Sequence, residues 1–140
     1  MLKVSLNAAG LDALPRRVAQ AALEVTLAGA TATAKAAREA VEEIHGTGVQ
    51  YAGLPNRSSS PGQAPQSQHG DLLDTIGTDQ EDVQGIGANA VAGDGTGKAL
   101  ALEAGTSNVE PRPFMGPAAE VGRETVEAML PGVAASLGRA

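Results

Sequence analysis

The sequence predicts an α+β fold with a long N-terminal helix, a small antiparallel sheet with a long exposed loop, and a C-terminal helix. Three observations predict it: an amphipathic segment over residues 11–44, short apolar runs between glycines over residues 77–102, and a second amphipathic segment over residues 118–130. Helices that flank a group of short strands are typical of this class. We expect a single domain over residues 1–140, with residues 46–70 as an extended loop or arm.

The first helix is predicted from the spacing of its apolar residues, which recur at steps of three and four over residues 14–44. In the middle of this stripe the residues are mostly Ala, Gly and Thr, which permit close approach. We expect that face to pack against a sheet or a neighbouring subunit. On the other face, Lys35 with Glu39 and Arg38 with Glu42 form four-apart pairs that suit a solvated surface.

The segment of residues 46–70 is rich in Gly, Pro, Ser, Gln and Asn and has no periodicity. A loop of this length in a small domain is usually functional or mobile, so we expect an exposed contact arm that its own composition cannot hold in place. Residues 71–76 follow as a short predicted helix, with Leu72, Leu73 and Ile76 on one apolar side.

Weak strand candidates come next, at Val83, Ile86 and residues 90–92. Leu100 and Leu102 alternate with alanines and suggest another strand, after a Gly-Asp-Gly that fits a hairpin turn.

The prolines of residues 111–117 predict an irregular segment, and the last helix is expected over residues 118–130, with Pro131 ending it.

Composition indicates a thin core. The chain has 42% apolar residues, but it contains one Phe, one Tyr and no Trp, and Ala supplies much of the apolar fraction. Ala buries little area, so such a fold gains stability from subunit contacts.

Charge and cysteine content exclude other classes. A net charge of −6 argues against a protein that neutralises a phosphate backbone, and without Cys there is no disulfide or thiolate zinc site. The start lacks the pattern of a signal peptide, and no 18 apolar residues occur in succession, so we expect synthesis in the cytoplasm and no membrane contact.

Catalytic motifs are not predicted. The run from Gly93 to Lys98 ends like a phosphate-binding loop, but Ala92 and Ala99 stand where that loop needs a glycine and a hydroxyl, and no buried strand is expected before it. His45 is not spaced with the other histidine as metal ligands on one helix face. We expect a protein that is not an enzyme and has no catalytic, cofactor or metal site.

Two segments resemble a known family. Leu102-Glu-Ala-Gly-Thr-Ser107, followed by Arg112-Pro-Phe-Met115 and Pro117-Ala118, resembles the late signature of the tail-completion or head-tail joining family of long-tailed bacteriophages, relatives of minor tail protein Z. Ser60-Pro-Gly-Gln-Ala-Pro65, leading into residues 70–76, resembles that family's other signature. The family tends to have an aromatic residue where Ala104 stands and a Tyr near Lys98.

The resemblance marks candidate subunit-interface or structural residues. These are Gly105, Thr106, Arg112, Pro113, Phe114, Pro117, Pro61, Gly62, Leu72 and Ile76. Phe114 either fills the core of its own domain or anchors a subunit interface. Arg112 either pairs with Glu103 or Glu110 or is solvated.

The resemblance implies a structural virion protein at the head-tail junction, or neck, of a tailed phage or phage-like particle, made in the host bacterial cytoplasm. It would form a homo-oligomeric ring, with a hexamer favoured and a dodecamer as the alternative. Its neighbours would be the connector or stopper, the tail terminator and the tail tube, and DNA would pass through the channel without sequence-specific binding. The sequence does not separate completion factor, terminator and stopper. The alternative function is a cytoplasmic non-enzymatic interaction module.

Overall fold

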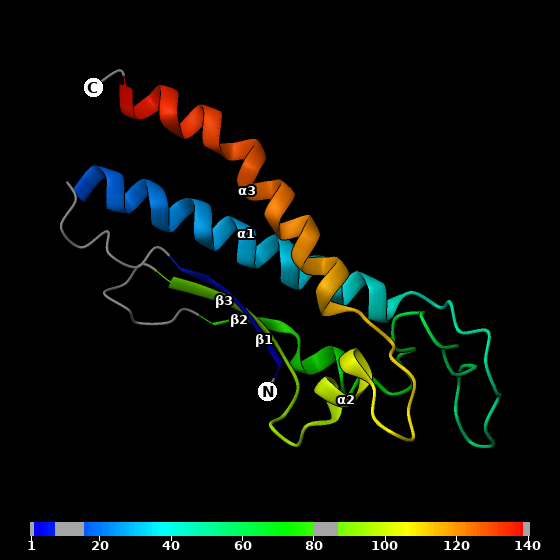
Figure 1. Ribbon diagram of the computed structural model, residues 1–140. Helices are drawn as coiled ribbons and strands as arrows, with labels where there is room; N and C mark the ends of the chain where they lie inside the picture. The colour runs from blue at the N-terminus through cyan, green and yellow to red at the C-terminus, as the bar shows by residue number, and fades with distance from the viewer. Residues whose placement is uncertain (1, 8–15, 80–86, 139–140) are drawn as a thin grey trace.

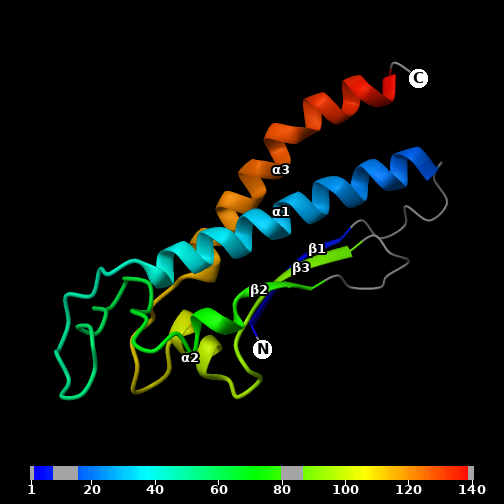
Figure 2. The same cartoon turned by 180° about the vertical axis from the view of Figure 1, so that it is seen from behind.

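The computed structural model describes residues 2–7, 16–79 and 87–138 of the chain (Figures 1 and 2). In order, the elements are β1 (Leu2–Asn7), α1 (Arg16–Glu42), the 3-10 helix η2 (Leu73–Thr75), β2 (Gly77–Asp79), β3 (Gly87–Ala92), α2 (Lys98–Ala104) and α3 (Met115–Gly138). The predicted α+β class is confirmed, with a long N-terminal helix, a three-stranded antiparallel sheet and a C-terminal helix.

The sheet has the order β1-β3-β2, and both pairings are antiparallel. In β3, Ala88, Ala90 and Ala92 are buried. Alternate residues of a strand share one face, so this row of small side chains gives α1 a flat surface on which to pack.

Helix α1 lies between the sheet on one side and α3 on the other, as both views show (Figures 1 and 2). Its buried residues are almost all small, and they are Val25, Gly29, Ala30, Thr33, Ala34, Ala37 and Val41. The expectation that the small-residue face packs against a sheet is therefore confirmed. Small side chains are needed because α1 is covered from two directions.

The crossing of α1 and α3 is closest at Gly122. A Cβ at this position would collide with Thr33 Oγ1 and would lie 2.8 Å from the carbonyl oxygen of Gly29. Thr33 Oγ1 in turn donates to Gly29 O at 2.8 Å, so its hydroxyl is satisfied inside the contact. Glycine at residue 122 therefore allows the two helices to approach closely.

The predicted bounds of the last helix were wrong at both ends, because α3 begins at Met115 and continues to Gly138. Pro117 lies in the first turn, where a missing N–H breaks no helical hydrogen bond. Pro131 is inside the helix, where it removes one backbone bond and is followed by Gly132, but the nearby helix formers Ala128, Leu130, Ala134 and Ala135 favour the helical state.

Two strand predictions need correction. Leu100 and Leu102 lie on helix α2, because Ala and Leu are strong helix formers and a four-residue alternation cannot distinguish the two periods. The Gly-Asp-Gly turn therefore connects β3 to a helix and is not a hairpin, although Gly93 and Gly95 do adopt positive φ. Val83 and Ile86 lie outside the described residues.

Strand β1 was not predicted at all, although Leu2, Val4 and Leu6 alternate with polar residues in its sequence. The predicted helix over residues 71–76 is reduced to the single 3-10 turn η2.

Arg38 does not behave as predicted. Lys35 and Glu39 form the expected pair at 4.0 Å, but Arg38 is half-buried and turns toward η2. Its Nη1 donates to the carbonyl oxygens of Leu73 (2.8 Å) and Ile76 (3.2 Å). A guanidinium on these carbonyls fixes the entry into β2 against α1.

The loop of residues 46–70 lacks regular structure, as predicted, but side-chain amides bind it together. Gln66 Oε1 accepts from the backbone N–H groups of His45 (2.7 Å) and Gly46 (2.8 Å), directly after α1. Gln63 Oε1 accepts from Ser60 N at 2.7 Å. Polar side chains thus supply hydrogen bonds in this loop where it lacks a backbone ladder.

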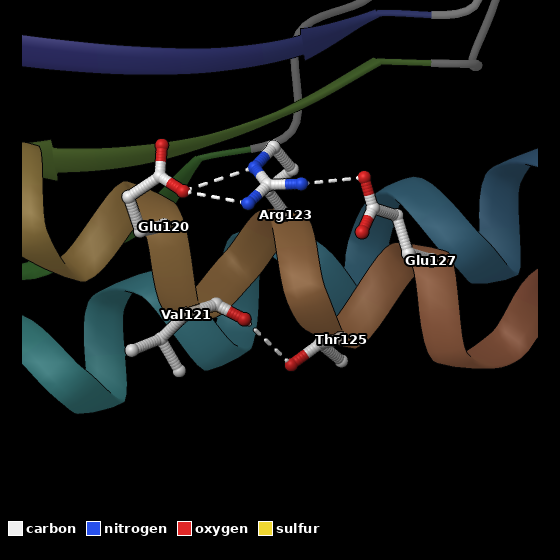
Figure 3. A network of polar contacts seen from close by, with 5 residues as sticks. All are labelled: Glu120, Val121, Arg123, Thr125 and Glu127. Carbon is white, nitrogen blue, oxygen red and sulfur yellow. Dashed lines mark hydrogen bonds and ion pairs between the residues drawn. The ribbon is translucent and has the colours of Figure 1, made fainter.

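On the exposed side of α3, Arg123 bridges two carboxylates (Figure 3). Its Nε and Nη2 donate to Glu120 Oε2 at 3.0 and 2.8 Å, and its Nη1 donates to Glu127 Oε1 at 2.5 Å. These bonds, first to Glu120 and then to Glu127, raise the pKa of Arg123. Thr125 Oγ1 donates to Val121 O on the preceding turn.

Candidate functional site

The two segments that carry the family resemblance lie side by side, although about 40 to 50 positions separate them. Gly62 N donates to Pro111 O at 3.0 Å, and Arg112 Nε donates to Ser59 O at 3.3 Å. Ser59 is buried at this contact. The fold thus joins the loop and the segment before α3 into one hydrogen-bonded unit, which we call the junction unit, residues 58–65 with 102–118.

Arg112 fastens the junction unit through carbonyl oxygens. Its backbone N donates to Leu102 O at 2.6 Å, and its Nη1 donates to Glu110 O at 3.0 Å. The structure therefore does not show the expected pairing of Arg112 with the carboxylate of Glu103 or Glu110. Arg112 acts here as a clamp that ties α2 and the loop to one another.

The carboxylate of Glu103 performs a different task. Its Oε2 accepts from the backbone N–H groups of Phe114 (2.7 Å) and Met115 (2.9 Å), and its Oε1 accepts from Gly116 N at 2.8 Å. These N–H groups belong to the start of α3, where a helix has unsatisfied donors and a partial positive charge. Glu103 is therefore an N-terminal cap of α3 supplied by another helix.

We expect Glu103→Ala to lower the free energy of unfolding by about 1–2 kcal/mol, because it uncaps α3. Glu103→Gln should lose less, since one amide oxygen can still accept. Urea denaturation followed by circular dichroism measures both. Glu110→Gln is the matched control, because the Glu110 side chain is exposed. If Glu103→Ala and the control unfolded at the same urea concentration, the capping role would be disproved.

Gly105 and Thr106 form the turn between α2 and the rest of the junction unit. Gly105 has φ 77°, and a Cβ there would lie 2.8 Å from Val109 O. Thr106 N donates to Val109 O at 2.7 Å, and Thr106 Oγ1 accepts from the N–H groups of Asn108 and Val109. These contacts explain the glycine and the hydroxyl of the late signature as turn formers.

The apolar candidates divide into a buried and a surface group. Phe114 and Ile76 are buried in the core of the chain, 1% and 4% exposed, and Leu72 packs at its edge. Pro113, Pro117 and Gly62 line a shallow apolar depression of about 320 Å³. It also includes α1 residues Ala36 and Ala40. Pro61 is exposed next to it. Both signature segments therefore contribute to one patch of surface.

The histidines have separate surroundings. His45 Nδ1 lies 2.5 Å from Glu43 O, and its Nε2 lies 2.6 Å from Ala64 O, so its ring is held by the backbone. His69 is exposed. Within residues 2–7, 16–79 and 87–138, no three His, Asp or Glu side chains gather in a way that could hold a metal ion.

The expectation that no buried strand precedes the loop of residues 93–98 was wrong, because β3 precedes the loop and helix α2 follows it. Asp94 Oδ1 accepts from Thr96 N (2.9 Å) and Thr96 Oγ1 (2.6 Å), and these bonds lower the pKa of the Asp94 carboxyl. An ionised carboxylate that occupies the loop's own donors disfavours a phosphate at this place.

Comparison with protein-family models, with curated proteins and with solved structures finds no match to this chain. In the part of the chain that the structure describes, no helix is long and apolar enough to cross a membrane.

Proposed function

We propose that this chain is a structural subunit of the head-tail junction of a tailed phage or phage-like particle, where it forms a ring that completes the tail and helps join it to the head connector. The observation that supports this proposal most is the junction unit. Its two segments resemble the two signatures of one family, and hydrogen bonds from Gly62 and Arg112 hold them together.

The make-up of the core is consistent with a subunit that depends on neighbours. Among residues 2–7, 16–79 and 87–138, the buried apolar residues apart from Phe114 and Met115 are Ala, Val and Ile, so this part of the chain buries little apolar surface. Several large apolar side chains are also exposed, among them Ile44, Val49 and Leu100. A ring would cover part of this surface.

A hexameric ring would match the rotational symmetry of the tail, and a dodecameric ring would match that of the portal. The connector or stopper would lie on one side of it, and the tail terminator and tail tube on the other. The net charge of −6 is consistent with DNA that passes without sequence-specific binding, since an acidic chain does not neutralise a phosphate backbone over a broad face.

Deletion of the gene in a strain that produces the particles tests the proposal. We expect full heads and separate tails to accumulate, because the joint between them is incomplete, and infectious particles to return when the gene is supplied on a plasmid. Electron microscopy of lysates counts joined and unjoined particles. A deletion strain with a normal fraction of joined particles would contradict the neck assignment and favour a free-standing interaction module.

A further inference from the structure

Helix α1 carries charges at both ends that oppose its own dipole. Arg16 and Arg17 begin the helix, Glu42 ends it and Glu43 follows; its first turn has no acidic residue and its last turn no basic one. A helix N-terminus has a partial positive charge and its C-terminus a partial negative charge, so Arg16, Glu42 and Glu43 are unfavourably placed along α1. Arg17 has a partner on another helix, because its Nη2 donates to the carbonyl oxygen of Leu137 near the end of α3 at 3.0 Å. Their placement points to partners outside the helix.

The arginine end of α1 borders a groove between α1 and the last turns of α3, where the two helix backbones lie apart (Figure 1). The groove has a volume of about 800 Å³. Its apolar lining consists of Ala21, Ala128, Met129, Val133 and Leu137. Arg16, Arg17 and Glu24 are its charged residues, so its mouth is net positive. We call this the basic groove.

The opposite end of α1 presents the complementary features. Ile44 is 79% exposed, Val49 58% and Tyr51 55%, an apolar group at the start of the loop. Glu42 and Glu43 are exposed next to it, and neither carboxylate has an ion-pair partner among the residues that the structure describes. In contrast, Glu120 and Glu127 of α3 are paired with Arg123 (Figure 3). We call residues 42–51 the acidic tip.

The basic groove and the acidic tip cannot meet within one chain. Helix α1 has 27 residues, which corresponds to about 40 Å, and the two features lie at its opposite ends in both views (Figures 1 and 2). Apolar and charged groups of the two surfaces therefore complement one another only between two copies of the chain.

We propose that copies of this chain associate head to tail, with the acidic tip of one copy seated in the basic groove of the next. Ile44, Val49 and Tyr51 would cover the apolar lining, and Glu42 and Glu43 would face Arg16 and Arg17. A contact between two different surfaces closes into a ring if its rotation allows and otherwise extends as a filament. Closure into a ring depends on the proposed function, whereas the head-to-tail contact itself does not.

Two reversed-charge variants test the contact. Arg16→Glu with Arg17→Glu gives an acidic groove, and Glu42→Lys with Glu43→Lys gives a basic tip. Glu42→Lys with Glu43→Lys also corrects the charge at its helix end, so the melting temperature of this variant should rise by a few degrees. Arg16→Glu with Arg17→Glu corrects the charge at the start of α1 but loses the hydrogen bond from Arg17 to Leu137 O, so its melting temperature should stay close to that of the wild type. A loss of association in either variant would then not result from unfolding.

Sedimentation velocity from micromolar to millimolar concentration measures association. We expect each variant alone to associate about tenfold more weakly than the wild type or worse, because like charges meet at every contact. An equimolar mixture should recover association, since the acidic groove fits the basic tip and the unchanged groove fits the unchanged tip. The control, Asp74→Lys with Asp79→Lys, changes net charge by the same amount as the tip variant at exposed sites outside both surfaces and outside the junction unit, and it should associate like the wild type.

The apolar half of the contact is tested by Ile44→Ser, which should weaken association without lowering the melting temperature, because this side chain is exposed in the single chain. A wild type that stays monomeric at millimolar concentration, or variants that associate as well as the wild type, would overturn the proposal. So would a mixture that fails to associate. The deletion experiment tests the neck function separately. If association failed in one of these ways but the deletion strain still did not join heads to tails, the head-to-tail contact would be rejected and the neck function would stand.

Discussion

Replacing Phe114 by Ala is expected to lower the free energy of unfolding by about 3–5 kcal/mol. The ring is 1% exposed and belongs to a core cluster with Ala34, Val41 and Ile76, in which Met115 is the other large buried side chain. A domain has about 5–15 kcal/mol of stability in total, so this variant should lose most or all of its cooperative unfolding transition. Thermal and urea denaturation followed by circular dichroism measure the effect.

Tyr51→Ala is the matched control for Phe114→Ala, since Tyr51 is the other aromatic residue of the chain and is 55% exposed. Its stability should change by no more than about 0.5 kcal/mol. If both variants unfolded like the wild type, Phe114 would not fill the core, and an interface role would have to replace it.

Gly122→Val is expected to destabilise the chain by about 3 kcal/mol, because a side chain at the α1–α3 crossing has no space. The obstacle is partly backbone, since the carbonyl oxygen of Gly29 lies 2.8 Å from the position of a Cβ, and backbone cannot move aside as a side chain can. Gly122→Ala should cost less. Combining it with Thr33→Ala should recover part of the loss, because Thr33 Oγ1 is the other obstacle.

Gly132→Ala provides the control within the same helix. A Cβ at Gly132 meets nothing within 4 Å, so this change should raise stability by about 0.5–1 kcal/mol through helix propensity alone. Urea denaturation of the four variants measures all of these differences. Equal destabilisation at residues 122 and 132 would show that helix propensity, and not the crossing, governs α3.

The sequence predicted the elements in which the periodic pattern of apolar residues extends over many positions. Helix α1 is 27 residues, and its three- and four-residue spacing leaves little ambiguity. Short elements were missed or misread for physical reasons. The six residues of β1 become a strand by pairing with β3, some 85 positions away, and the Ala-Leu alternation of α2 fits either period. The sequence predicted a helix end at Pro131, but a proline removes only one backbone hydrogen bond, and α3 continues through it to Gly138.

The candidate site was predicted in part. Resemblance alone marked Gly105, Arg112 and Phe114; a glycine suits the positive φ of the turn at residue 105, and a phenylalanine suits the buried position at residue 114. The role of Glu103 could not be read from its position, because an acidic residue gives no sign that it caps a helix beginning 12 residues later. The arginines and glutamates at the ends of α1 did give a signal, since their order opposes the helix dipole.

Cryo-electron microscopy of purified particles tests the proposed function most directly. The account predicts density for this chain as a closed ring around the DNA passage, between the head connector and the first ring of the tail tube, with the junction unit and the two ends of α1 at contacts between subunits. Particles whose neck density is fully explained by other chains, with this protein absent from their mass spectra, would contradict the account.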